Sequence, residues 1–273
     1  MALQTVSPLV RTTLIFGVLA GCVLPLSAND WPEWRGVNRD GVWSETGIVD
    51  AMPNELNVKW RVPINSGFSG AAVADGRVFI TDWAEDPTSR TMDGTERAIA
   101  LDEETGEILW VREWPTTYRM LMISYAIGPR ATPTVDGDRV YVVGATGDLY
   151  CLNVDTGAVL WEKHYIADYD SFIPTWGVAS SPIVDGDRLI TVVGGEPGGL
   201  IMAFDKRTGA EVWRALDVVG EMGYGQPILV DAGGARQLIV WHAAALVSLN
   251  PETGDLYWEE EWEAGGGMSV ATP

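Results

Sequence analysis

The stretch ALDEETGEILW, at residues 100–110, decides the fold because the chain repeats its pattern three more times. The other copies are CLNVDTGAVLW (151–161), AFDKRTGAEVW (203–213) and SLNPETGDLYW (248–258). All four keep Thr-Gly in the middle and tryptophan at the end, and they recur about every fifty residues. A period near fifty is typical of propellers and solenoids.

Each copy is predicted to be a β-hairpin. In the first copy, RAIALD and EILWV have the composition of strands, and EETG forms a tight turn between them. The glycine suits a turn position with positive φ, and the Asp or Asn three residues before the threonine can accept hydrogen bonds from the turn amides.

A second pair of strands precedes each copy, as in VDGDRVYVV (135–143) and VDGDRLITVV (184–193). Asp-Gly between alternating apolar runs is a strong hairpin signal. Four strands in each period, with no helical pattern between them, make one propeller blade. The predicted fold is therefore an all-β propeller of four-stranded antiparallel blades, with four complete blades at 68–112, 130–162, 179–214 and 225–259.

The repeated glycines and tryptophans are predicted to be structural. A large flat ring at the end of an outer strand can lie over the glycine turn of an adjacent blade, because glycine has no side chain to block it. We expect this docking to hold blade to blade. The residues involved are Gly106, Trp110, Gly157, Trp161, Gly209, Trp213, Gly254 and Trp258.

The repeat resembles the tryptophan-docking motif of propellers of the pyrroloquinoline-quinone (PQQ) type. The leader WPEWRGVNRDGVWSETGI (31–48) is similar to the segment before the propeller in many secreted bacterial members. The family contains quinoprotein dehydrogenases, an outer-membrane assembly lipoprotein that binds no cofactor, and members of unassigned role. The resemblance implies the fold more specifically than the activity.

Family members usually have seven or eight blades, more than this chain supplies. VKWRVPI (58–64) looks like a solitary outer strand with its own Trp60, and VATP (270–273) matches the segments that begin the second and third blades. We therefore expect a C-terminally truncated fragment that stops at the start of a fifth blade. The alternative is a closed four-bladed ring with a short tail.

The first residues are predicted to direct export. An apolar run at 14–24, followed by Pro25 and the small residues Ser27 and Ala28, has the shape of a secretory signal and is too short to span a bilayer. LAGC (19–22) also resembles a lipobox, in which Cys22 would be lipidated. We expect a signal peptide at 1–28, a leader at 29–57, a propeller at 58–273, and a location in the periplasm or outer membrane of a Gram-negative-type bacterium.

The formal net charge of −20 argues against nucleic acid as a partner, because phosphate binding needs a cationic surface. It also argues against adsorption to anionic lipid, so a membrane contact is expected only through a lipid anchor. Cys151 occupies a slot that holds Ala or Ser in the other copies, which favours a packed thiol over a reactive one.

A partner or ligand is expected on the face that carries the long irregular segments 82–97, 114–130 and 164–177. No catalytic or metal-ligand arrangement follows from the residue spacing, and no cofactor is expected. The candidate partner-binding residues on these loops are Arg119, Tyr125, Arg130, Tyr169 and Trp176.

Three functions remain open at this level. The first is a non-catalytic extracytoplasmic scaffold that binds another protein or an envelope component. The second, implied by the resemblance, is part of a quinoprotein dehydrogenase that oxidises an alcohol or aldose with PQQ and calcium, although the adjacent cysteine pair of the alcohol-oxidising members is absent here. The third is a carbohydrate-binding module, favoured by the aromatic loops.

Overall fold

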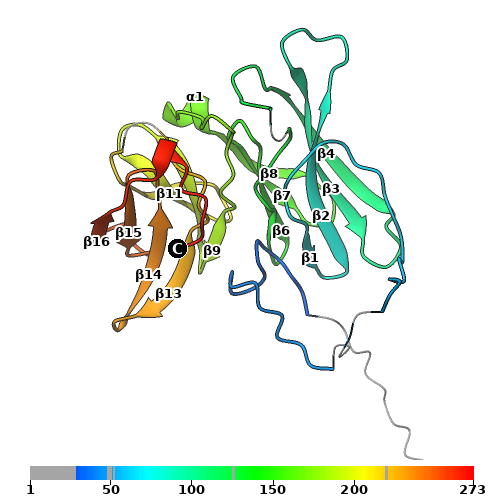
Figure 1. The fold of residues 1–273 in the computed structure, drawn as a ribbon, viewed down its shortest axis with the longest axis horizontal. Helices are drawn as coiled ribbons and strands as arrows, with labels where there is room; N and C mark the ends of the chain where they lie inside the picture. The colour runs from blue at the N-terminus through cyan, green and yellow to red at the C-terminus, as the bar shows by residue number, and fades with distance from the viewer. Residues whose placement is uncertain (1–28, 48–50, 52, 125–126, 219–220) are drawn as a thin grey trace, which may run out of the picture.

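The computed structural model describes residues 29–47, 51, 53–124, 127–218 and 221–273. The predicted signal peptide, the lipobox and Cys22 lie outside the described residues. The described residues form four four-stranded antiparallel sheets, and within each sheet the strands lie side by side in chain order. Figure 1 shows these sheets next to one another. The prediction of four-stranded propeller blades is confirmed.

Blades 1 and 2 are the first two sheets. They comprise β1 (Ala72–Ala74), β2 (Arg77–Glu85), β3 (Asp93–Asp102), β4 (Ile108–Thr117), β5 (Thr134–Asp136), β6 (Arg139–Val143), β7 (Asp148–Asn153) and β8 (Val159–His164). Blades 3 and 4 comprise β9 (Ile183–Asp185), β10 (Arg188–Gly195), β11 (Gly199–Asp205), β12 (Glu211–Ala215), β13 (Ile228–Ala232), β14 (Ala235–Trp241), β15 (Ala245–Leu249) and β16 (Leu256–Glu261).

Two of the predicted loops differ from the expectation: strands shorten one, and the other contains a short helix. β2 and β3 extend through most of segment 82–97 and leave only residues 86–92 as a loop. The polar run and Pro87 hid this extension, since they break the apolar alternation that marks a strand. A five-residue helix, α1 (Tyr165–Tyr169), also lies in segment 164–177, where only a loop was expected.

The Thr-Gly turns are built as the sequence predicts. In blade 1, Asp102 Oδ1 accepts hydrogen bonds from the backbone N of Thr105 at 2.8 Å and from its hydroxyl at 2.8 Å. Gly106 then adopts φ +73°, a conformation that suits glycine. Asn153 and Asp205 make the same two contacts in blades 2 and 3. The turn is therefore a local consequence of its own residues.

Tryptophan docking joins each blade to the next. A Cβ added to Gly157 of blade 2 would lie 2.6 Å from the ring of Trp110 of blade 1. The Trp110 indole N donates to the backbone O of Val154 at 2.9 Å. The other docked pairs of ring and glycine are Trp60–Gly106, Trp161–Gly209 and Trp213–Gly254. The core lies between the facing sheets, where Phe79 and Trp110 pack with Leu152.

Trp258 is the exception: among the described residues it docks on no glycine turn, and its docking stays a prediction. Its side chain is 41% exposed, and its indole N donates to Gln237 Oε1 in its own blade at 3.1 Å. Every residue of β16 is exposed. Among the described residues, segment 58–64 likewise joins no sheet, although Trp60 docks on blade 1. The sheets therefore do not close into the four-bladed ring that was the alternative.

Side-chain hydrogen bonds also connect the segments that lead into the innermost strands. The backbone N of Gly70 donates to Thr132 Oγ1 at 3.2 Å, and the N of Thr132 donates to Ser181 Oγ at 2.9 Å. The N of Ser181 donates in turn to Gln226 Oε1 at 2.6 Å. Blades 1, 2 and 3 thus each donate one amide hydrogen bond to the side chain at the same position in the next blade.

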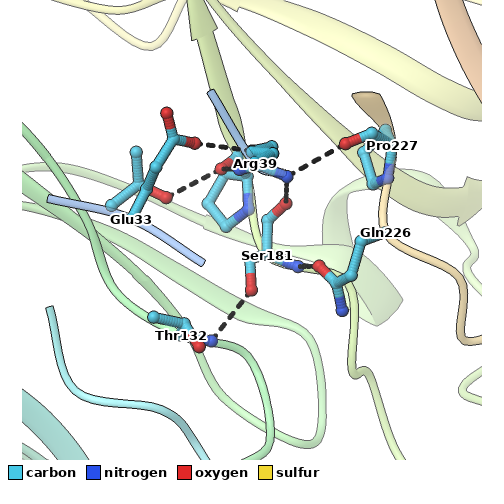
Figure 2. A network of polar contacts seen from close by, with 8 residues as sticks. Glu33, Arg39, Thr132, Ser181, Gln226 and Pro227 are labelled. Carbon is cyan, nitrogen blue, oxygen red and sulfur yellow. Dashed lines mark hydrogen bonds and ion pairs between the residues drawn. The ribbon is translucent and has the colours of Figure 1, made fainter. Parts of the chain in front are cut away.

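The leader crosses these inner segments and fastens them together. The backbone of Trp31 pairs with Val73 in β1 at 2.8 and 2.9 Å. Arg39 is 3% exposed, and its guanidinium donates to Glu33 at 2.5 Å, to the backbone O of Ser181 at 3.3 Å and of Pro227 at 3.1 Å, and to that of Pro182. Figure 2 shows Arg39 between Glu33 and the backbones of blades 3 and 4. One buried cation therefore holds two blades to the leader.

Candidate docking face

Long connections gather at one end of the blades, and we call this end the loop-rich face. It consists of the described residues of loops 118–133, 165–182, 216–227 and 262–273, which follow the outer strands, together with loop 86–92 between β2 and β3. In Figure 1 these loops, with α1 and the 3₁₀ segment η1 (Gly265–Gly267), lie at the upper end of the sheets. The expectation that the irregular segments share one face agrees with this arrangement.

Backbone hydrogen bonds connect successive loops of this face. The N of Met122 donates to the O of Thr175 at 2.7 Å, and the N of Tyr224 donates to the O of Ser269 at 3.0 Å. Because the connections pass from one blade to the next, side chains on different loops are held at fixed separations. The face is a continuous surface rather than a set of independent loops.

A cavity of about 500 Å³, which we call the axial cavity, opens on this face where the segments leading into the inner strands meet. Its lining residues are Arg130, Trp176, Ala179, Tyr224, Met268 and Val270. Trp176 and Tyr224 meet edge to face, with ring centroids 5.7 Å apart. Burial lowers the pKa of Arg130 from its usual value. The axial cavity thus combines one guanidinium with two aromatic rings.

Glu221 fixes the aromatic pair. Its Oε1 accepts hydrogen bonds from the backbone N of Thr175 at 3.2 Å and from the Thr175 hydroxyl at 2.8 Å. The Tyr224 hydroxyl donates to Glu221 Oε2 at 3.1 Å and accepts from the N of Trp176 at 3.3 Å. Burial raises the pKa of Tyr224, so this hydroxyl keeps its proton. One carboxylate therefore ties two loops together behind the rings.

The structure brings together only two of the five residues that the sequence singled out. Arg130 and Trp176 both line the axial cavity. Arg119 is exposed on the loop after β4 and is not among the residues that line that cavity. Tyr169 packs against Phe204, with ring centroids 5.9 Å apart. Tyr125 lies outside the described residues, and a binding role for all five stays a prediction.

Sequence reasoning missed a buried carboxyl near this face. Glu96 is 0% exposed and accepts hydrogen bonds from the Tyr118 hydroxyl at 2.5 Å, the Trp114 indole N at 2.9 Å and the backbone N of Ala145 at 2.8 Å. Burial, its largest influence, raises the pKa of Glu96 to about 7. The contact with Ala145 joins blade 1 to blade 2. A glutamate inside an alternating strand gave no signal for this, because its partners are distant in sequence.

The described residues hold neither a cluster of metal ligands nor a membrane-spanning helix. No three His, Cys, Asp or Glu side chains gather there as metal ligands. No helix in that part of the chain is both long and apolar enough to cross a membrane.

Comparison with known proteins places this chain among the PQQ-type propellers. A crystal structure of quinohemoprotein alcohol dehydrogenase from Comamonas testosteroni superposes with a TM-score of 0.65 at 16% identity, over 89% of this chain and 43% of that one. Quinoprotein alcohol dehydrogenase PedH of Pseudomonas putida is 31% identical over 47% of this chain and 21% of its own length.

Outer membrane protein assembly factor BamB of Burkholderia pseudomallei is 28% identical over 42% of this chain and 27% of its own. The chain therefore spans less than half the length of these relatives. The family model for outer membrane protein assembly factor BamB matches residues 54–162 and 95–271, which together include most of the chain. On that match, this chain belongs to the BamB-type family of PQQ-like repeat propellers.

Proposed function

We propose that this chain is an extracytoplasmic, non-catalytic scaffold that docks another protein through its loop-rich face. The observation that carries the proposal is a set of exposed apolar side chains on two connected loops. Met120 is 82% exposed, Ile166 55% and Phe172 53%. Exposed apolar patches on soluble proteins mark interaction sites, and methionine adapts readily to a partner surface.

The comparisons support this proposal in part. Two of the relatives are named as outer membrane protein assembly factors, and the matching family model carries the same description. Assembly with other envelope proteins is consistent with the predicted export signal. A lipid anchor at Cys22 and a periplasmic or outer-membrane location remain predictions.

Site-directed photo-crosslinking in the cell envelope tests the proposal. A photoreactive amino acid at Phe172 should give a discrete crosslinked band, and Met120→Glu in the same chain should abolish that band. The matched control is Leu160, which is 43% exposed on the outer strand β8 and should give no band. Equal crosslinking at Leu160, or none from the loop-rich face, would refute the docking function.

A second candidate function is part of a quinoprotein oxidoreductase, and the axial cavity favours it. A guanidinium beside two aromatic rings suits a flat anionic cofactor such as PQQ, by charge pairing and by stacking. The described residues supply no cluster of ligands for the calcium that such dehydrogenases also use. Quenching of tryptophan fluorescence by added PQQ, lost in Arg130→Ala, would favour this function over the scaffold. A carbohydrate-binding role needs a positive glycan-binding screen.

We also propose that further blades cover the open face of β16. Trp258 is the equivalent of Trp110 and Trp161, yet it remains exposed where they are docked. A sheet with a Thr-Gly turn, placed as blade 2 is placed against blade 1, would bury Trp258 as Gly157 and its turn bury Trp110.

A further inference from the structure

A second cavity, of about 420 Å³, lies on the loop-rich face between blades 1 and 2, apart from the axial cavity. We call it the interblade cavity. It is bounded by the end of β4, residues 120–121 of the next loop, Thr146 between β6 and β7, the start of β7, the end of β8, and α1 with the loop that follows it. The volume falls near the lower end of the range for cavities that bind small ligands, about 300–1,000 Å³. The cavity has room for a single large side chain.

Most of the interblade cavity is apolar. Leu121, Tyr165 and Ile173 form its wall, and Tyr165 is 0% exposed. Met120 and Ile166 lie at its edge, and they belong to the exposed apolar set described above. The cavity is therefore continuous with the proposed docking surface, and an apolar group entering it would leave water.

One wall of the cavity is polar, and its hydrogen bonds are satisfied internally. His164 Nδ1 lies 2.8 Å from Asp148 Oδ1, and the Thr146 hydroxyl donates to Asp148 Oδ2 at 2.8 Å. Because Thr146 uses its proton on that carboxylate, the Thr116 hydroxyl, 2.9 Å away, donates to Thr146. This chain of contacts crosses from blade 1 to blade 2 and fixes the shape of the wall before any partner arrives.

The surroundings of this wall are acidic. Glu162 Oε1 lies 3.7 Å from His164 Nε2, and Asp168 Oδ2 accepts a hydrogen bond from the His164 backbone N at 2.8 Å. The hydrogen bond to Asp148, first among the causes, and the charges of Asp148, Glu162 and Asp168 raise the pKa of His164. Even with His164 protonated, three carboxylates outnumber one imidazolium. The charge at the cavity therefore favours a cationic partner.

We propose that the interblade cavity is an anchor pocket for one apolar side chain of a partner protein segment whose neighbouring residues are lysine or arginine. The proposal rests on the docking function proposed above. The apolar side chain enters the cavity, where burial of an anchor contributes most of the affinity. The flanking cations lie against Glu162 and Asp168 at the edge and set the choice of partner. An acidic segment would be repelled.

Labelled peptides test the proposal by fluorescence anisotropy with the full chain at low salt. The probes are KKLKK, KKAKK and EELEE. We expect KKLKK to bind at least tenfold more tightly than KKAKK, which lacks the anchor, and than EELEE, which reverses the charge. Ala167→Phe should weaken KKLKK at least tenfold, because Ala167 is exposed, lines the cavity and can accept a ring there without unfolding α1. A thermal melt of this variant checks that the fold is kept.

Charge variants separate the acidic edge from general attraction. Glu162→Gln should weaken KKLKK several-fold, whereas Glu252→Gln should not. Glu252 is an exposed glutamate in the Thr-Gly turn of blade 4, on the opposite end of the sheets, so both changes remove the same charge. Equal effects of the two variants, or equal binding of KKLKK and KKAKK, would show attraction to the acidic chain alone and overturn the proposal.

Four further results would also test the anchor pocket. Binding of hexylamine as tight as that of KKLKK, and lost in Ala167→Phe, would assign the cavity to a small amine instead. Self-association that Ala167→Phe abolishes would assign it to a second copy of the chain, and would also overturn the proposal. Failure of KKLKK to bind, with Phe172 crosslinking intact, would remove the anchor pocket and leave the docking function standing. Loss of the Phe172 crosslink, with KKLKK still bound, would remove the docking function and leave the pocket's affinity for the peptide standing.

Discussion

Substitution of the docking glycine measures how strongly a ring joins two blades. Gly157 and Gly137 both belong to blade 2 and have positive φ, +68° and +57°. A Cβ at Gly137 would meet no atom within 4 Å, whereas one at Gly157 would lie 2.6 Å from the Trp110 ring. Gly137→Ala should therefore cost only the backbone strain, about 1–2 kcal/mol. Gly157→Ala should lose about a further 1–3 kcal/mol, because the ring must move and its packing is disturbed.

Urea unfolding followed by far-ultraviolet circular dichroism gives the free energy of unfolding of each variant. The same two glycine substitutions should then be made in a Trp110→Ala chain. Without the ring, the extra loss at Gly157 should disappear, and the two alanine variants should lose similar stability. A double-mutant cycle with no coupling between Trp110 and Gly157 would refute the docking account, as would equal losses in the chain that keeps its tryptophan.

Three further perturbations follow from single side chains. Glu96→Gln removes a group that titrates, and the folded state keeps the Glu96 proton at pH values where the unfolded state releases it. The free energy of unfolding of the unmodified chain, measured relative to the variant, should therefore fall as pH rises from 4.5 through about 7, by up to about 3 kcal/mol. Paired urea titrations across that range check this, and a rise instead of a fall contradicts it. Arg39→Ala should destabilise the chain by about 3 kcal/mol, since three buried carbonyls and the partly buried Glu33 lose their donor. Arg61→Ala, at an exposed position, should leave the melting temperature nearly unchanged. Trp161→Ala should cost about 3–5 kcal/mol by the same measurement and Trp258→Ala much less, because only Trp161 is docked; equal losses would contradict the difference in burial.

The blades could be predicted because their determinants are local. The Asp102 side chain bonds the turn two and three residues ahead, and Gly106 takes a conformation that suits its own residue type. The docking of Trp110 on Gly157 is a long-range contact, yet it could be predicted because the glycine and the tryptophan both recur in all four copies of the repeat. Only Trp258 broke the pattern, since what it needs is a neighbouring sheet and not a different residue.

The candidate site could be predicted only in outline, because its contacts do not repeat. The inner hydrogen-bond ladder uses threonine, serine and glutamine at equivalent positions, and their shared property is a side-chain oxygen that sequence comparison does not single out. Glu96 looks like an ordinary strand residue until Tyr118 and Ala145 are placed beside it. Each of these groups bonds a partner tens of residues away.

The two ends of the blades therefore differ in kind. The end with the Thr-Gly turns repeats because every blade has to present the same glycine to the same ring, and any change there weakens a joint between blades. The loop-rich end carries no such requirement, so its loops differ in length and hold the exposed Met120 and Phe172, the cavity residues Arg130 and Trp176, and the acidic edge around His164. In a chain built from repeats, the positions where the repeat fails are those free to meet a partner. The same division explains why the repeat identifies the fold of the family, while the proposed docking function depends on loop side chains outside the repeat.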